Sequence, residues 1–172
     1  TDDPEQIQKL REVIFEDGQM NKNDVGITAS EIAKMAGIEL PPSTRLILLA
    51  ADGAGTEDIL AKDKLCPVIA IMRYSTFDHA VTMAKANLLV EGAGHSAALH
   101  SNSDHHIEKA GLELPISRLV INQPSSLTAG GSLTNGFAPT TTLGCGSWGG
   151  NSISENLDYK HLMNVSRIGK II

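Results

Sequence analysis

Cysteine, basic residues and long apolar runs are all scarce in this sequence, and each shortage excludes a class of protein. Its 172 residues contain two cysteines, too few for a disulfide-stabilised scaffold. Lys and Arg number 14 against 20 Asp and Glu, which argues against a nucleic-acid or anionic-membrane surface. No apolar run approaches the ~20 residues that span a bilayer, and the polar start resembles no secretory signal. We expect a cytoplasmic protein that binds neither nucleic acid nor a membrane.

The composition that is present is typical of a globular protein. Apolar residues make up 41% of the chain and charged residues 20%. A chain of this length can bury enough surface for one full core or two small ones. It begins at Thr1 rather than at a methionine, which is compatible with a processed product or with a piece of a longer polypeptide.

Two helices in the first part of the chain are marked by capping residues. The first is expected over residues 3–18, where Asp3 can accept hydrogen bonds from the first turn and apolar residues recur every three or four positions. The second is expected over residues 28–37, where Thr28 and Glu31 have the spacing of a capping box.

The middle of the chain alternates apolar strands with helices. The predicted strands cover residues 45–51, 67–72, 95–100 and 118–121, and the predicted helices cover 77–92 and 104–110. The first two strands are apolar without alternation, which is typical of parallel strands covered on both faces. The pattern predicts an α/β layer with mainly parallel pairing, in which ligands bind along one edge of the sheet.

The segment from Pro124 to Ser152 breaks this pattern, because it is rich in Gly, Ser and Thr. A structureless stretch of this length is usually functional or disordered, and the single tryptophan, Trp148, favours an ordered loop. Its Gly144–Gly149 run matches G-x-G-x-x-G, but no convincing helix follows, so we reject a dinucleotide fingerprint. The tail from Tyr159 to Ile168 is expected to form one strand.

The two cysteines allow different interpretations. Cys145 lies in the glycine-rich loop, where backbone N–H groups could lower the pKa of its thiol and make it a nucleophile. The alternative is a small buried side chain in a tight turn. Cys66 precedes an apolar strand, which favours burial without chemistry.

The six histidines do not form a recognisable metal site. His100, His105 and His106 lie near acidic residues, but their spacing matches no zinc pattern, so we interpret them as surface residues and predict no metal. His95 follows a glycine turn at the start of a predicted strand, where α/β sheets place ligand contacts. A structural, hydrogen-bonded histidine is an equally good interpretation.

Three motifs, taken together, resemble one enzyme family. The run Thr142–Asn156, followed by Lys160–Asn164, resembles the C-terminal signature of CoA-acylating aldehyde dehydrogenases. Asp63–Pro67 is similar to that family's Glu-Lys-Leu-Ser-Pro, and Gly92–Ser96 is similar to its Gly-x-Gly-His-Thr. The order and spacing resemble most closely the aldehyde dehydrogenase half of bifunctional aldehyde–alcohol dehydrogenases.

The resemblance implies an activity and roles for particular residues. In that family a cysteine thiolate attacks an aldehyde, hydride passes to NAD, and the acyl group passes to coenzyme A. Asp63 matches the acidic residue that binds the nicotinamide-side ribose, and Leu65 matches the apolar residue beside the nicotinamide. His95 and Cys145 would lie around the aldehyde and CoA side of the pocket. The nucleophilic cysteine and the dinucleotide-binding domain would lie upstream, so no catalytic residue is expected in this chain.

The resemblance also implies an architecture. Residues 1–156 would be part of a three-layer α/β/α catalytic domain with a mainly parallel sheet, and residues 157–172 a C-terminal strand for contact between subunits of a homo-oligomer. On this interpretation the isolated chain is inactive. Two alternatives are a non-catalytic self-association module and a small redox or metal–thiol protein that uses Cys66 and Cys145.

Overall fold

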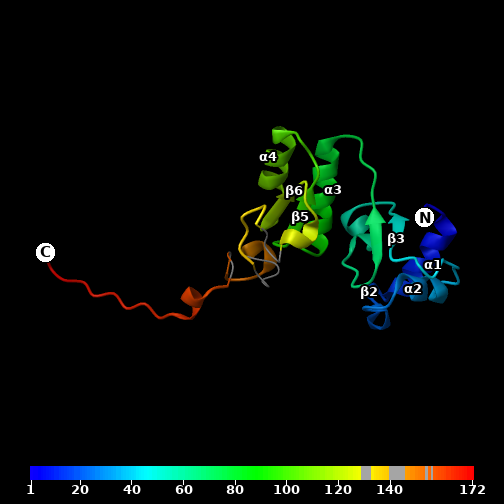
Figure 1. The fold of residues 1–172 in the computed structure, drawn as a ribbon, viewed down its shortest axis with the longest axis horizontal. Helices are drawn as coiled ribbons and strands as arrows, with labels where there is room; N and C mark the ends of the chain where they lie inside the picture. Colours follow the sequence, from blue (N-terminus) through cyan, green and yellow to red (C-terminus); the bar gives the residue numbers. More distant parts are fainter. Residues whose placement is uncertain (129–132, 140–145, 154, 156) are drawn as a thin grey trace. The chain divides into compact units, whose positions relative to one another are not determined.

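A computed structural model of the chain describes residues 1–128, 133–139, 146–153, 155 and 157–172. The chain folds as two compact units. Unit 1 comprises Thr1–Ala93 and Asp104–Pro115, and unit 2 comprises Gly94–Ser103 and Ile116–Ile172. The helices within the described residues are all too short or too polar to cross a membrane. Figure 1 shows the elements of both units in sequence colours.

Unit 1 begins with helix α1 (Pro4–Ile14), which the Asp3 carboxylate caps as the sequence predicts. The helix ends earlier than the predicted boundary at residue 18. Strands β1 (Phe15–Glu16) and β2 (Gln19–Met20) follow as a tight antiparallel hairpin. Its two turn residues, Asp17 and Gly18, have φ values of 49° and 75°. This left-handed conformation reverses the chain and cannot continue a helix.

The second helix confirms its predicted start. Helix α2 (Ala29–Met35) is capped by Thr28, whose hydroxyl accepts from the Glu31 N–H while the Glu31 carboxylate accepts from the Thr28 N–H. A single 3₁₀ turn, η1 (Lys22–Asp24), leads into it. The capping box therefore forms as the residue types and spacing require.

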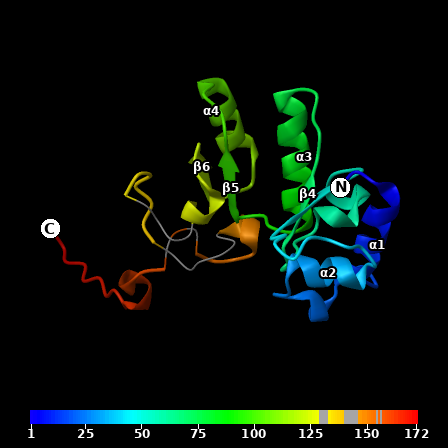
Figure 2. The ribbon, with the colours of Figure 1, turned by 45° about the vertical axis from the view of Figure 1, so that its right-hand side comes forward.

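Strands β3 (Ile47–Ala50) and β4 (Val68–Ile71) form a parallel pair, which confirms the predicted topology. Ile47 lies opposite Val68. One face of the pair packs on α1 and α2 in the main apolar core. Figure 2 shows these two helices beside the strand pair. The buried residues of this core are Ile7, Leu10, Ile14, Phe15, Ala29, Ile32, Ala33, Ala36, Ile47, Leu49, Leu60 and Val68.

The other face of β3 and β4 is apolar but exposed, contrary to the prediction of cover on both faces. Leu48 and Ile69 are 44% and 49% exposed, and Ile71 is 45% exposed. Strand residues alternate between faces, so these side chains point away from the core that holds Leu49. The apolar residues therefore form a strand face that is suited to packing, but no segment of unit 1 buries this face.

The crossing from β3 to β4 contains two 3₁₀ turns, η2 (Gly55–Glu57) and η3 (Ile59–Ala61). Helix α3 (Phe77–Val90) follows β4 and packs against η2. Helix α4 (Asp104–Glu113) contacts α3, and its Lys109 forms ion pairs with Asp78 and Glu113. The two helices predicted over residues 77–92 and 104–110 are therefore confirmed.

Unit 2 holds strands β5 (Ser96–Leu99) and β6 (Arg118–Ile121), a second parallel pair that confirms two further predictions. The 3₁₀ turn η4 (Ser125–Thr128) packs on both strands. In the described part of the glycine-rich loop, η5 (Ser147–Gly149) is a 3₁₀ turn rather than the start of a helix, in line with rejection of the dinucleotide fingerprint. Trp148 within it is 58% exposed, so its side chain does not anchor the loop in a core.

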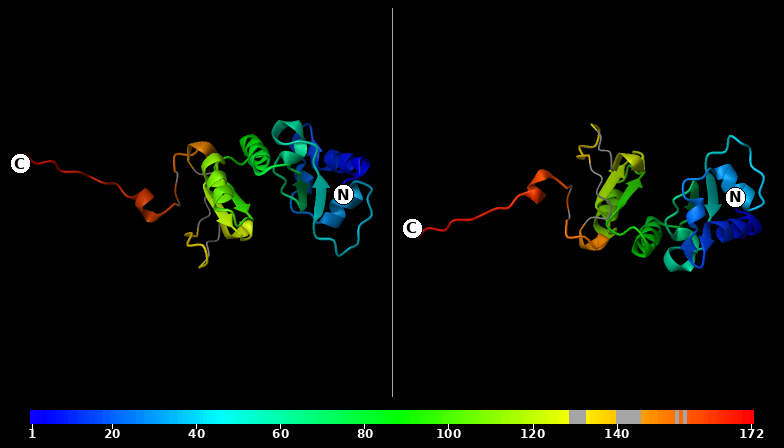
Figure 3. Two further views of the ribbon diagram at one scale, coloured as in Figure 1. Left: turned by 90° about the horizontal axis from the view of Figure 1, so that it is seen from above. Right: turned by 90° about the horizontal axis from the view of Figure 1, so that it is seen from below.

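The predicted strand near the C-terminus is not present. Tyr159–Leu162 form a 3₁₀ turn, η6, and residues 163–172 contain no strand. Figure 3 shows this tail, in red, leaving η6 without a neighbouring strand. A strand needs a partner for its backbone N–H and C=O groups, and nothing in the described part of this chain supplies one to the tail.

Candidate functional site

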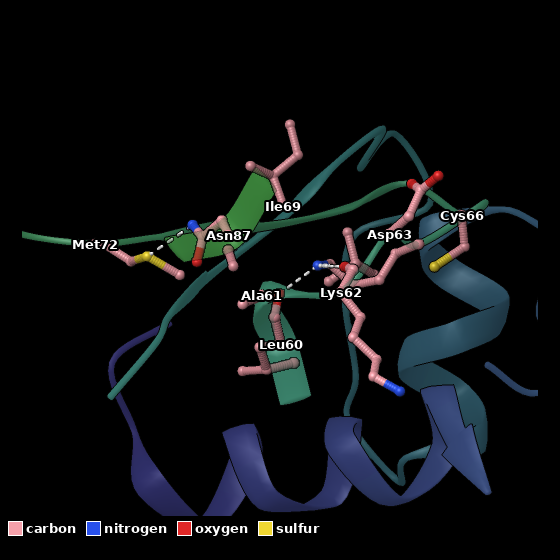
Figure 4. A pocket seen from close by; sticks show the side chains of 11 residues that line it. Leu60, Ala61, Lys62, Asp63, Cys66, Ile69, Met72 and Asn87 are labelled. Atoms are coloured by element: carbon pink, nitrogen blue, oxygen red, sulfur yellow. Dashed lines mark hydrogen bonds between the residues drawn. The ribbon is translucent and has the colours of Figure 1, made fainter. Parts of the chain in front are cut away.

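An open cavity of about 450 Å³ lies in unit 1, between the β3–β4 crossing, β4 and α3. Figure 4 shows the Met72 sulfur facing the Asn87 amide at one end of the cavity, and Asp63 and Cys66 at the other. Its lining residues are Leu60, Ala61, Lys62, Asp63, Lys64, Cys66, Val68, Ile69, Ala70, Met72 and Asn87. The cavity combines an apolar floor from β4 with a polar rim.

The rim of the cavity is the segment from Lys62 to Leu65, which connects η3 to β4. We call residues 62–65 the rim loop. The Lys62 ammonium donates to the Gly18 carbonyl at 2.7 Å. The Leu65 carbonyl accepts from the Gly26 N–H at 3.0 Å, and the Leu65 N–H donates to the Met20 sulfur at 3.2 Å. The hairpin and the turn after it therefore hold both ends of the loop.

The centre of the rim loop is held from a different direction. The Asp63 N–H donates to the Glu91 carboxylate at 2.8 Å. The Lys64 ammonium turns inward and donates to the carbonyls of Leu60 and Lys62. The loop has few remaining free backbone groups, so its side chains are presented on a fixed backbone.

Lys64 and Cys66 are two half-buried titratable residues of the cavity, and burial shifts the pKa of each. Burial lowers the pKa of the Lys64 ammonium, while the nearby charges of Cys66, Asp63, Asp58 and Glu91 oppose this shift. Burial raises the pKa of the Cys66 thiol, and the Asp24 carboxylate adds to this effect. A thiol with a raised pKa is a poor nucleophile at neutral pH, which agrees with the prediction of no chemistry at Cys66.

The structure places the two predicted cofactor residues together on the rim loop. The Asp63 side chain is exposed, and no group in the described residues hydrogen-bonds its carboxylate, so both oxygens can accept from a ligand. Leu65 is 60% exposed but is not among the residues that line the cavity. The arrangement can bind hydroxyl donors at Asp63, with an apolar surface two residues away.

The other predicted site residues lie elsewhere. His95 belongs to unit 2, is exposed, and its carbonyl accepts from the Ser117 N–H at 2.8 Å. Cys145 lies outside the described residues. His106, predicted to be a solvated surface residue, instead stacks on the Phe77 ring with centroids 3.9 Å apart and an angle of 12°. The helical contact of α4 with α3 brings these two rings together.

Sequence reasoning missed two polar residues of α3 and its C-cap: Asn87, which lines the cavity, and Glu91, which hydrogen-bonds the rim loop. The Asn87 side chain accepts from the Gly55 N–H at 2.6 Å and donates to the Met72 sulfur at 3.4 Å. Asn87 interrupts the apolar part of the helical pattern of α3, and this was the one available signal. No three His, Cys, Asp or Glu side chains in the described residues are grouped closely enough to hold a metal ion.

Nearly the whole chain is similar in sequence to parts of known dehydrogenases. It is 55% identical, over 168 residues, to the succinate-semialdehyde dehydrogenase (acetylating) of Clostridium kluyveri, a match that covers 98% of this chain and 37% of the relative. It is 37% identical, over 169 residues, to the aldehyde–alcohol dehydrogenase of Clostridium acetobutylicum, covering 96% of this chain and 20% of that protein. The chain is homologous to part of the acylating aldehyde dehydrogenases.

Structural comparison with the acylating aldehyde dehydrogenases agrees. The crystal structure of an acetylating aldehyde dehydrogenase from Geobacillus thermoglucosidasius matches 98% of this chain with a TM-score of 0.85 and 30% identity. The match covers 39% of that structure, so this chain spans well under half the length of its relatives. No protein-family model matches the chain. The resemblance inferred from the three motifs, and the α/β fold that it implies, are confirmed.

Proposed function

We propose that this chain forms part of an NAD-dependent, CoA-acylating aldehyde dehydrogenase, which converts an aldehyde, CoA and NAD to an acyl-CoA and NADH, reversibly. The observation that carries the proposal is the 55% identity to an acetylating semialdehyde dehydrogenase over nearly the whole chain. The match covers 98% of the chain and so includes the rim loop, the Gly92–Ser96 motif and the C-terminal signature. We infer that these segments serve the same chemistry here.

The rim loop fits the ribose and nicotinamide part of a dinucleotide. A ribose offers hydroxyl donors, and the free Asp63 carboxylate can accept them. Aspartate is one methylene shorter than the glutamate that the family motif carries, so we infer that a water bridges Asp63 and the ribose. Leu65 offers an apolar surface to the ring. When bound, the nicotinamide supplies the hydride acceptor.

The reactive thiol is proposed to come from outside these 172 residues. Cys66 is a poor candidate because burial raises the pKa of its thiol. The exposed apolar face of β3 and β4 supports the same view, since Leu48 and Ile69 offer a surface suited to packing. We infer that polypeptide belonging to the rest of the enzyme covers this face and carries the nucleophile and the dinucleotide-binding domain.

The remaining roles follow from the same proposal. We place His95 and Cys145 on the aldehyde and CoA side of the pocket. Residues 1–156 belong to the catalytic domain, and residues 157–172 serve a homo-oligomer, because the tail exposes Val165, Ile168 and Ile172. A second subunit would supply the strand partner that the tail lacks. The scarcity of cysteine fits the reducing cytoplasm.

A chimera tests the proposed function. In the Clostridium kluyveri relative, the matching segment is replaced by residues 1–172 of this chain, and NADH formation is followed with succinate semialdehyde, acetaldehyde, CoA and NAD. We expect CoA-dependent turnover, and a raised KM for NAD in the Asp63→Ala form of the chimera. A folded chimera that reduces no NAD with any aldehyde contradicts the proposal, and parallel assays with NADP determine the preferred cofactor.

The isolated chain provides the complementary test. We expect no turnover from the 172 residues alone, since we place the nucleophilic thiol in the rest of the enzyme. Steady NADH formation would contradict this and direct attention to Cys145.

Self-association without catalysis is the second candidate function, and the exposed apolar tail is the observation that favours it. Sedimentation velocity of the chain with and without residues 157–172 distinguishes the two functions. A chain that is monomeric in both forms eliminates the self-association module.

A further inference from the structure

The Glu91 carboxylate is placed where a helix disfavours it. Glu91 is the C-cap of α3, and its own N–H donates to the Asn87 carbonyl at 3.2 Å. The C-terminal end of a helix carries partial negative charge, so a carboxylate at this position is repelled by the helix dipole. Stabilisation of α3 therefore does not explain a glutamate here.

The contact that Glu91 makes lies on the rim loop instead. Its Oε2 accepts from the Asp63 N–H at 2.8 Å, across 28 residues of sequence. A hydrogen bond to a charged acceptor is shorter and stronger than one between neutral groups. The Glu91 carboxylate therefore holds the backbone of the residue to which the proposed function assigns the ribose.

One other restraint reaches the same peptide group, because the Lys64 ammonium donates to the Lys62 carbonyl at 2.8 Å. The remaining restraints on the loop act at different points. Lys62 is held through its side chain to Gly18, and Leu65 is held through its backbone to Met20 and Gly26. None of these contacts fixes the peptide group that precedes the Asp63 Cα. Loss of the Glu91 carboxylate would therefore leave both ends of the loop in place, remove the acceptor of the Asp63 N–H, and leave this peptide group held through the Lys62 carbonyl by the flexible Lys64 side chain.

We propose that Glu91 is a positioning residue for the cofactor: by holding the Asp63 N–H it orients the Asp63 carboxylate toward the ribose of the dinucleotide. The proposal rests on the proposed function, because it assigns the ribose to Asp63. The negative charge of Glu91 also opposes, in small part, the lowering of the Lys64 pKa by burial. The side chain itself is exposed, so its removal creates no cavity in the core.

The experiment uses the active chimera with Glu91→Ala and Glu91→Gln substitutions. Glu5→Ala, at an exposed glutamate on α1, is the matched control for loss of one surface negative charge. We expect Glu91→Ala to raise the KM for NAD about tenfold and to leave kcat within about twofold, because ground-state and transition-state binding are lost together. Glu91→Gln keeps an oxygen acceptor, so its KM should lie close to the parent value.

A second measurement reports on the contact directly. Amide hydrogen exchange at Asp63 in the 172-residue chain should be faster in Glu91→Ala than in the parent or in Glu5→Ala. An unchanged KM for NAD in Glu91→Ala overturns the proposal, as does a fall in kcat that accompanies a lower melting temperature. An inactive unsubstituted chimera contradicts the proposed function itself and the role of Glu91 with it, whereas an active chimera with unchanged KM contradicts only the role of Glu91.

Discussion

Arg11 and Asp58 form a two-point ion pair although 47 residues separate them in sequence. The Arg11 Nη2 lies 2.7 Å from the Asp58 Oδ2, and its Nε lies 3.3 Å from the Oδ1. The Asp58 carboxylate is 3% exposed and also accepts from the N–H groups of Asp52 and Leu60, both at 2.9 Å. The pair therefore ties α1 to the crossing that leads into the rim loop.

Removing the Arg11 cation should lower the free energy of unfolding. Arg11→Met leaves a buried carboxylate without its counter-charge, and we expect a loss of about 3 kcal/mol in the free energy of unfolding, measured by urea denaturation. Lys9→Met is the matched control, because Lys9 pairs with Glu5 on the exposed side of the same helix. An Arg11→Met variant as stable as Lys9→Met would show that the pair does not stabilise unit 1.

The same ion pair contributes to the loss of stability at low pH. Burial by itself would raise the pKa of the Asp58 carboxyl, but the hydrogen bonds from Arg11, Leu60 and Asp52 outweigh it and hold the pKa below its usual value. The folded state then binds fewer protons than the unfolded state. The stabilisation is present above about pH 4, the unfolded value, and is lost as the pH falls through the lower folded value. Urea unfolding at successive pH values should show a smaller acid loss in Asp58→Asn than in the parent.

Asp24 should respond to pH in the opposite direction. It is fully buried, neither carboxylate oxygen has a hydrogen-bond partner in the described structure, and burial raises the pKa of the carboxyl. The folded state here binds the extra proton, so stability is highest below the unfolded pKa and falls as the pH rises through the folded value.

Asp24→Asn cannot ionise, so the variant should gain stability relative to the parent between about pH 4 and pH 7. The same urea series measures the difference in the free energy of unfolding. A difference that stays constant over this range would mean that the Asp24 carboxyl is not desolvated.

Gly55 is required for both its backbone conformation and its lack of a side chain. Its φ is +64°, and a Cβ there would lie 3.1 Å from the Ala86 Cβ of α3. We expect Gly55→Ala to cost about 2 kcal/mol in the free energy of unfolding, from strained backbone and overpacking together. Gly18→Ala separates the two terms, because Gly18 has φ +75° but open space around it. Equal losses in the two variants would show that the contact with α3 is not restrictive.

Local sequence features were sufficient for the helices and for most of the strands. Asp3, Thr28 and Glu31 cap helices through contacts within three residues, so the residue types and spacing alone predict them. The apolar runs around Ile47 and Val68 likewise became a parallel pair. Three motifs together identified the homologous family, and the long run Thr142–Asn156 was the most specific of them.

What the sequence determined by itself was therefore the identity of the elements, their order and the family to which they are related. The tertiary structure alone decided which distant groups meet: Glu91 with the Asp63 backbone, Arg11 with Asp58, and Asp24 with an interior that offers its carboxylate no partner. It also decided that one apolar face of β3 and β4 stays open and that the tail after Leu162 has no strand. The physical reason is that caps and periodicity act over one helical turn, whereas burial and hydrogen-bond satisfaction depend on segments far apart in sequence.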